Sequence, residues 1–165
     1  MKSLFFYINE SNSNLEYNAL LSLDDWCWCC KNEKDISLLV DDITDIINGY
    51  IYSLSRERET KKLSYNIEDF ILNDIKELRK SINLDGYMRS DYSKLQANNI
   101  GTNTNIFNNY KRNVDVWILN CYDENDAKYI IFKIFSTLLS CASKILNKNH
   151  TCIKNLKTII NKVSK

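Results

Sequence analysis

Three cysteines lie close together in the sequence, at Cys27, Cys29 and Cys30. Thiolates are good zinc ligands, so the cluster raises the hypothesis of a metal site or of a small helical enzyme that uses one. Zinc sites usually combine two pairs of ligands, however, and no second pair follows downstream. His150 and Cys152 would complete a site only if the fold brought them to the cluster. We therefore favour the interpretation that these cysteines are small buried hydrophobic residues, with no metal bound.

The chain has six cysteines in 165 residues. An even number suggests a disulfide framework in a small secreted protein, but a chain of this length can form a core without disulfides. The apolar start, residues 1–8, is too short for the core of a signal peptide. We expect reduced thiols and an intracellular location. Cys141 lies within an apolar segment and is predicted to be in the core.

Residues typical of catalytic sites are scarce. The single histidine, His150, stands among Asn and Lys residues and is interpreted as solvated. The acidic pairs at 24–25, 41–42 and 68–69 fall at helix starts or on polar faces, where capping and dipole interactions explain them. Three scattered glycines cannot form a phosphate-binding loop. We therefore predict that the protein is not an enzyme, and assign no catalytic, cofactor-binding or metal-binding residue.

The charge balance argues against a nucleic-acid partner. There are 22 basic and 21 acidic residues, so the overall field does not favour a polyanion. Five basic residues near Tyr65 could form a weak nucleic-acid patch, but we interpret them as ordinary solvated surface. They are Lys61, Lys62, Lys76, Arg79 and Lys80. No apolar run approaches the roughly 18–20 residues that cross a bilayer, so we expect no membrane insertion.

The apolar spacing predicts helices throughout. Residues 14–30 have mixed spacing, so a helix is expected without a defined buried face, and the pattern assigns no clear structure to residues 1–34 as a whole. Asp35 is predicted to cap a helix that continues to Leu54, with Asp41, Asp42 and Asp45 on its polar side. Within this helix, Gly49 would allow a close helix crossing.

Further helices are expected along the rest of the chain. One covers residues 66–82, a short polar one residues 89–97, and another residues 114–122. Residues 98–109 are rich in Asn, Thr and Gly and are predicted to form a loop. A final helix is expected to be capped near Thr151.

The segment 127–146 is the most apolar, with one narrow polar stripe through Lys133, Ser136, Thr137, Ser140 and Lys144. A helix that is apolar around most of its circumference must be surrounded by others. The sequence thus predicts an all-α, compact bundle of about six to seven helices, with 127–146 as the central helix and residues 35–165 as the helical domain.

Three segments carry a family resemblance. They are Trp117–Glu124, Ile131–Ala142, with its Cys141-Ala142 step, and Ile43–Leu54. Together they resemble the poxvirus Bcl-2-like proteins, and in particular the vaccinia virus group that blocks innate immune signalling. The absence of Pro and the three Gly also indicate an AT-rich genome, for which certain protozoa, low-GC bacteria and large AT-rich DNA viruses are the candidate sources. The segment Leu4–Cys30 has no counterpart in the group.

The resemblance implies a Bcl-2-like fold and a non-enzymatic viral protein of the host cytoplasm. Such proteins sequester host signalling adaptors or kinases to inhibit NF-κB or interferon induction, and many form homodimers. We find no Asn-Trp-Gly-Arg motif and expect no membrane anchor, which favours signalling inhibition over the alternative, an apoptosis inhibitor whose groove captures pro-apoptotic helices. The third alternative is the Cys-based metal protein. No partner-binding residue can be carried over.

Overall fold

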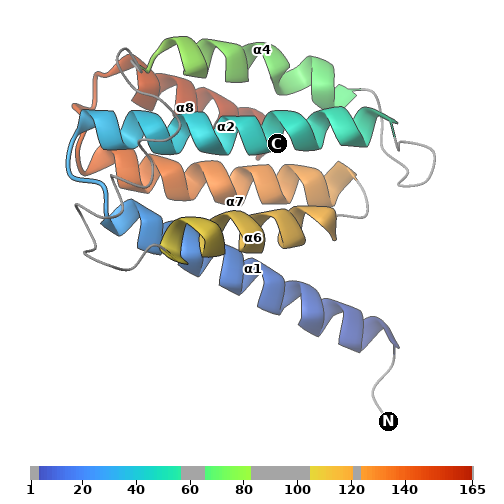
Figure 1. Cartoon of the computed structure of the whole chain (residues 1–165). Coiled ribbons are helices and arrows are strands. Elements are labelled where there is room, and N and C mark those ends of the chain that lie inside the picture. The colour runs from blue at the N-terminus through green and yellow to red at the C-terminus, as the bar shows by residue number, and fades with distance from the viewer. Residues whose placement is uncertain (1–3, 57–65, 83–104, 121–123, 165) are drawn as a thin grey trace.

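The computed structural model describes residues 4–56, 66–82, 105–120 and 124–164, and within these ranges it contains helices and no strand (Figure 1). The predicted all-α class is therefore confirmed. The helices in these ranges are α1 (Leu4–Trp28), α2 (Glu33–Arg56), α4 (Asn66–Lys80), α6 (Asn105–Leu119), α7 (Glu124–Ser143) and α8 (Thr151–Val163). None of them is long and apolar enough to cross a membrane.

Helix α7 is the centre of the bundle, as its apolar sequence predicts. It packs against α8, α1 and α2, and Figure 1 shows it between the α1/α6 pair and the helices α2 and α8. Its buried side chains include Ile131, Ile134 and Phe135, each 0% exposed. The helix spans 124–143 rather than the predicted 127–146. Acidic residues occupy its first turn, which suits the helix dipole, and residues 144–146 form turns closed by the carbonyls of Cys141 and Ala142.

Helix α1 is longer and more regular than its mixed apolar spacing suggested. It packs against α6 and α7 through an inner face that includes Ala19, Leu23 and Trp26. Its outer face also carries apolar side chains, so the helix has no single hydrophobic stripe from which a buried face could be read. This is why residues 14–30 gave no clear orientation.

Helix α2 begins at Glu33, two residues before the predicted cap. The side chain of Asn32 accepts a hydrogen bond from the Asp35 amide (3.0 Å), and the Asp35 carboxylate accepts one from the Lys31 amide (2.7 Å). This reciprocal pair resembles a capping box, so Asp35 stabilises the start of the helix from within its first turn. The predicted apolar face is buried at Ile36, Leu39, Val40, Ile43, Ile47, Tyr50 and Ile51.

Helix α4 covers the other side of α2 and also packs on α8. Arg79 joins α4 to α2 by donating to Asp41 (2.9 Å) and Asp45 (2.6 Å). Lys162 of α8 donates to Asp74 of α4 (2.6 Å). Of the residues interpreted as solvated basic surface, Arg79 is therefore engaged in a structural ion pair, whereas Lys61, Lys62 and Tyr65 lie outside the described residues.

Helix α6 corrects two predictions. It spans 105–119 instead of 114–122, so residues 105–109 of the predicted loop are helical. The reason is tertiary packing, because Tyr110 is fully buried and stacks on Trp26 of α1, with ring centroids 5.8 Å apart. Val114 and Trp117 follow on the same buried face. The remaining loop residues, 98–104, and the predicted helix 89–97 lie outside the described residues.

His150 has a structural role, although its side chain is partly exposed to solvent. It is the N-cap of α8, where its Nδ1 accepts a hydrogen bond from the Cys152 amide (3.0 Å), and its Nε2 lies 2.8 Å from the Glu33 carboxylate. Because Nδ1 accepts, Nε2 carries the proton that is donated to Glu33. One side chain therefore caps α8 and joins it to the start of α2.

Replacing His150 should cost stability in proportion to the lost cap. We expect His150→Ala to lower the free energy of unfolding by about 1 kcal/mol. His150→Asn should retain most of this stability, because an Asn side chain also accepts from the N-terminal amides of a helix. Urea unfolding of both variants measures the difference. Equal losses in the two variants would contradict the capping role.

Candidate functional site

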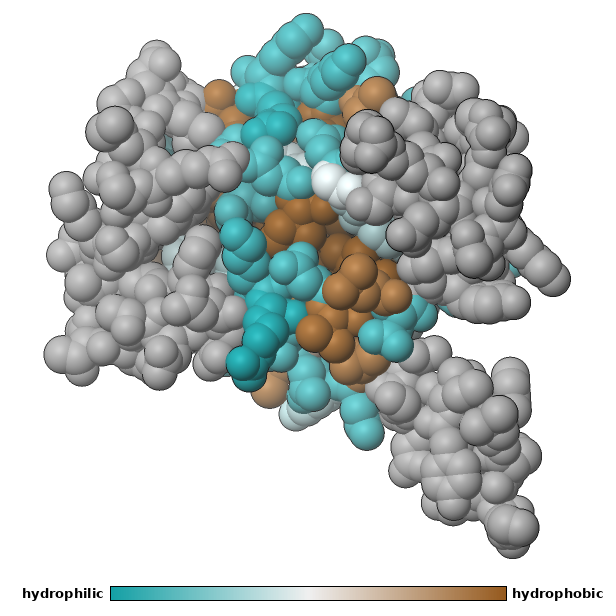
Figure 2. All heavy atoms as spheres, turned by 45° about the vertical axis from the view of Figure 1, so that its right-hand side comes forward, coloured by the Kyte–Doolittle hydropathy of each residue, from teal (hydrophilic) through white to brown (hydrophobic). Residues whose placement is uncertain are grey.

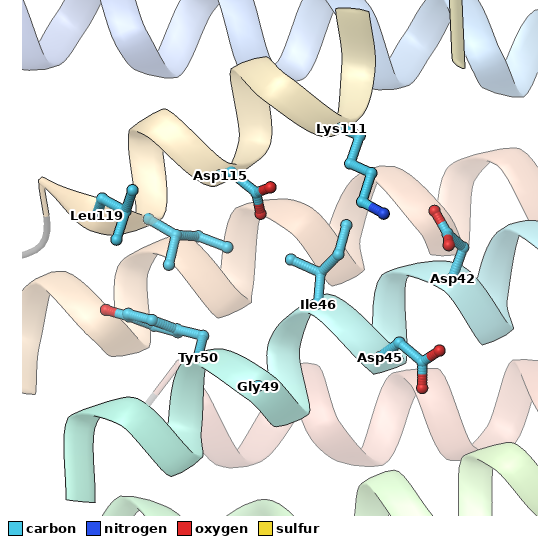
Figure 3. A pocket seen from close by; sticks show the side chains of 9 residues that line it. Asp42, Asp45, Ile46, Gly49, Tyr50, Lys111, Asp115 and Leu119 are labelled. Carbon is cyan, nitrogen blue, oxygen red and sulfur yellow. The ribbon is translucent and has the colours of Figure 1, made fainter. Parts of the chain in front are cut away.

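A groove of about 470 Å³ runs between α2 and α6. Figure 3 shows the side chains of the two helices facing each other across it. Its volume lies within the range of about 300–1,000 Å³ that ligand sites occupy. It is lined by Asp42, Asp45, Ile46, Gly49, Tyr50, Lys111, Asp115, Ile118 and Leu119.

The groove exists because the two helices pack on different partners. Helix α6 packs mainly on α1, whereas α2 packs on α4 and α7. At one end of the groove the Tyr110 hydroxyl of α6 donates a hydrogen bond to the Asp42 carboxylate of α2. Toward the other end, around Tyr50 and Leu119, the helices stay apart (Figure 3).

Gly49 widens the groove instead of permitting a close helix crossing. It is exposed on α2, and a Cβ placed on it would meet nothing within 4 Å. The predicted close approach at this residue is therefore absent. With no side chain at Gly49, the backbone of α2 is accessible on the side that faces α6.

The apolar lining of the groove is open to solvent at Leu119, whereas Tyr50 and Ile118 are buried. Leu119 is 71% exposed and Val116, near it on α6, is 38% exposed. Helix α6 ends toward the right of Figure 1. Figure 2 brings that side of the molecule forward and shows hydrophobic side chains gathered among hydrophilic ones. Exposed apolar surface of this kind, bordered by polar residues, is typical of protein interaction sites.

Charged residues border the apolar part. Asp45 is engaged by Arg79, while Lys111 and Asp115 project from α6 toward α2 (Figure 3). Burial raises the pKa of the Asp115 carboxyl above its ordinary value, and the Lys111 ammonium partly opposes the rise. This carboxylate therefore costs stability in the free protein.

Removing the Asp115 charge should stabilise the protein. Because the folded-state pKa is raised, the penalty is present at pH values above that pKa and disappears as the pH falls through it. Because the carboxyl is partly exposed and therefore screened by solvent, we expect Asp115→Asn to raise the free energy of unfolding by at most about 0.5 kcal/mol at pH 7, with the gain vanishing in acid.

The matched control is Asp126→Asn, because Asp126 lies in the first turn of α7, where a negative charge is favourable. That substitution should lower stability at pH 7. Urea unfolding at several pH values tests both, and a loss of stability in Asp115→Asn at pH 7 would show that its carboxylate is structural.

The residues of the hypothetical metal site are not brought together. The Cys27 and Cys30 thiols face Cys141, and the Cys29 thiol donates instead to the Asp25 carbonyl (3.2 Å). His150 caps α8, as described above. Among the described residues, no group of three or more His, Cys, Asp or Glu side chains has a geometry that could hold a metal ion.

Sequence reasoning missed the groove. Asp42 was placed on the polar side of its helix, but it is only 7% exposed and bonds to Tyr110. The groove depends on how α6 sits relative to α2, which no local pattern encodes. The available signal was the run of apolar residues Trp117, Ile118 and Leu119, which is wider than a single buried face and leaves Leu119 outside it.

The outer face of α1 is a second exposed apolar surface. Tyr17, Leu21 and Trp28 are 65%, 46% and 80% exposed and share one side of the helix. Lys31 lies over the Trp28 ring, 5.0 Å from its centroid. Tyr17 and Leu21 line a cavity of about 290 Å³ whose lining residues all belong to α1, whereas the larger α2/α6 groove has walls from two helices, so we regard the groove as the principal candidate.

Comparison of the chain with protein-family models, with curated proteins and with solved structures found no match. The Bcl-2-like assignment thus stays a prediction from the sequence.

Proposed function

We propose that this is a viral, non-enzymatic binding protein that holds a helical segment of a host signalling adaptor or kinase in the α2/α6 groove. By sequestering that partner in the host cytoplasm it inhibits NF-κB or interferon induction. The observation that carries the proposal is the groove itself, with its exposed apolar wall at Leu119 and a carboxylate at Asp115 that costs stability in the free protein.

The shape and chemistry of the groove favour an amphipathic helix as the occupant. Two roughly facing helices with apolar side chains between them form the kind of trough into which a third helix inserts its apolar face. Apolar anchors on the incoming helix would contact Ile46, Tyr50 and Leu119. A Lys or Arg on the same helix would pair with Asp115, which would repay the cost of burying that carboxylate.

The signalling role rests on the sequence resemblance. The segments Trp117–Glu124 and Ile131–Ala142, which resemble the vaccinia virus signalling inhibitors, cover the end of α6 and most of α7. A protein of this class needs no catalytic residues, because it acts by occupying its partner. Its affinity would depend on a few apolar side chains at the centre of the interface.

The same groove favours a second candidate function. A Bcl-2-like apoptosis inhibitor would use it to capture pro-apoptotic helices, which are also amphipathic. The two candidates differ in the partner and not in the mode of binding, so the identity of the captured protein separates them.

Affinity purification from mammalian cells tests the proposal. The tagged protein is recovered and its partners are identified by mass spectrometry, in parallel with NF-κB and interferon-promoter reporters. Recovery of a signalling adaptor or kinase with reduced reporter output is the expected result. Binding of pro-apoptotic peptides without reporter inhibition would establish the second candidate. A protein that recovers no signalling partner and binds no pro-apoptotic peptide would contradict groove binding.

A further inference from the structure

Three thiols from two distant parts of the chain meet beside α7. Cys27 is near the end of α1, Cys30 follows that helix, and Cys141 lies in the last turn of α7. The Cys141 thiol donates to the Cys27 carbonyl (3.8 Å), the Cys30 thiol donates to the Trp26 carbonyl (3.7 Å), and all three side chains line one cavity. All three are free thiols in this structure.

The cluster is accessible to small reagents. Cys141 and Cys30 are only 5% and 7% exposed, but all three cysteines line a cavity of about 540 Å³ that Trp28 and Lys144 also border. Hydrogen peroxide is small enough to enter such a space. A fourth thiol, Cys152, is fully buried elsewhere in the core and provides an internal comparison.

The surroundings favour ionisation of Cys141. When it loses its proton, the Cys27 and Cys30 thiols both donate hydrogen bonds to the sulfur, and the Lys144 ammonium adds a favourable charge. These interactions lower the pKa of Cys141 below its ordinary value, while the pKa values of Cys27 and Cys30 are raised. Burial raises the pKa of Cys152 to about 11. Since the thiolate is the reactive form, Cys141 should react far faster than Cys152.

We propose that Cys141 is a peroxide-sensitive thiol that forms a disulfide with Cys27 or Cys30, and so joins the end of α1 to the end of α7. The Cys141 thiolate attacks one oxygen of hydrogen peroxide, the O–O bond breaks, and hydroxide leaves, giving a sulfenic acid. The Cys27 or Cys30 thiol, held beside that sulfur, then attacks it; its proton leaves with the displaced hydroxyl group as water, and the S–S bond forms. In total two thiols lose two electrons and two protons, and one peroxide becomes two waters.

The test uses the wild-type chain. The purified reduced protein is treated with a small excess of hydrogen peroxide, remaining thiols are alkylated, and peptides are mapped under non-reducing conditions. We expect a Cys141–Cys27 or Cys141–Cys30 peptide, reversed by dithiothreitol, while Cys152 stays alkylated. The oxidised protein should also have a higher thermal midpoint, because the bridge constrains the unfolded chain.

Variants show which thiol reacts first. In Cys27→Ala/Cys30→Ala, peroxide should convert Cys141 to a sulfenic acid that dimedone traps, without an intramolecular disulfide. In Cys141→Ala, Cys27 and Cys30 should be oxidised roughly tenfold more slowly than Cys141 is in the wild type. A Cys141 that stays reduced in the wild type, or that pairs with Cys121, Cys152 or a second molecule, would overturn the proposal.

Discussion

Truncation of Phe135 to alanine should remove a large part of the free energy of unfolding of this protein. Phe135 lies in the middle of α7 and is 0% exposed, so its removal leaves a cavity at the point where α7 meets its neighbours. We expect Phe135→Ala to lower the free energy of unfolding by about 3–5 kcal/mol. A domain of ordinary stability has about 5–15 kcal/mol in total, so the variant should be marginal.

Leu119→Ala is the matched control for this measurement. The side chain is also large and apolar, but it is 71% exposed, so we expect a change within about 0.5 kcal/mol. Urea unfolding monitored by circular dichroism compares the two variants with the wild type. A loss from Phe135→Ala no larger than that from Leu119→Ala would show that α7 is not the centre of the core.

Leu119→Arg should abolish partner binding while leaving the fold intact. The substitution places a charge on the exposed apolar wall of the groove, where an incoming helix would have to desolvate it. Because Leu119 is the exposed apolar residue of the groove that a bound helix would contact, a loss of about 2 kcal/mol or more is expected, which corresponds to at least roughly thirtyfold weaker binding. Partner recovery by affinity purification and reporter inhibition should both fall to background.

Leu21→Arg is the matched control for the groove. Leu21 is 46% exposed on the outer face of α1, so the same chemical change is made on the competing apolar surface. We expect this variant to retain binding. Loss of binding in Leu21→Arg with retention in Leu119→Arg would move the interface from the groove to α1.

The helical architecture could be predicted because the apolar pattern determines it locally. The spacing of Ile43, Ile47 and Ile51 defines one face of α2, and the nearly continuous apolar sequence of residues 130–142 requires a central helix. Cys141 was correctly placed in the core for the same reason. These predictions depend on side chains within one helix.

The features that were missed depend on pairs of elements. The N-terminal cap of α8 is a histidine that also bonds to Glu33, more than a hundred residues away in sequence, and no local pattern identifies such a cap. The start of α6 is helical because Tyr110 packs on Trp26, although the preceding Asn-rich sequence favours a loop. The groove and the thiol cluster likewise arise from the relative positions of helices, which composition and periodicity do not specify.

Site-directed photo-crosslinking at the groove tests the proposed function most directly. A photoreactive phenylalanine analogue is placed at Leu119 or, as the comparison, at Leu21, and the protein is irradiated in mammalian cells. Groove binding predicts that position 119 crosslinks to a helical segment of a host signalling adaptor or kinase and that position 21 does not. Crosslinks from position 21 alone, or none from either position while the partner still co-purifies, would contradict it.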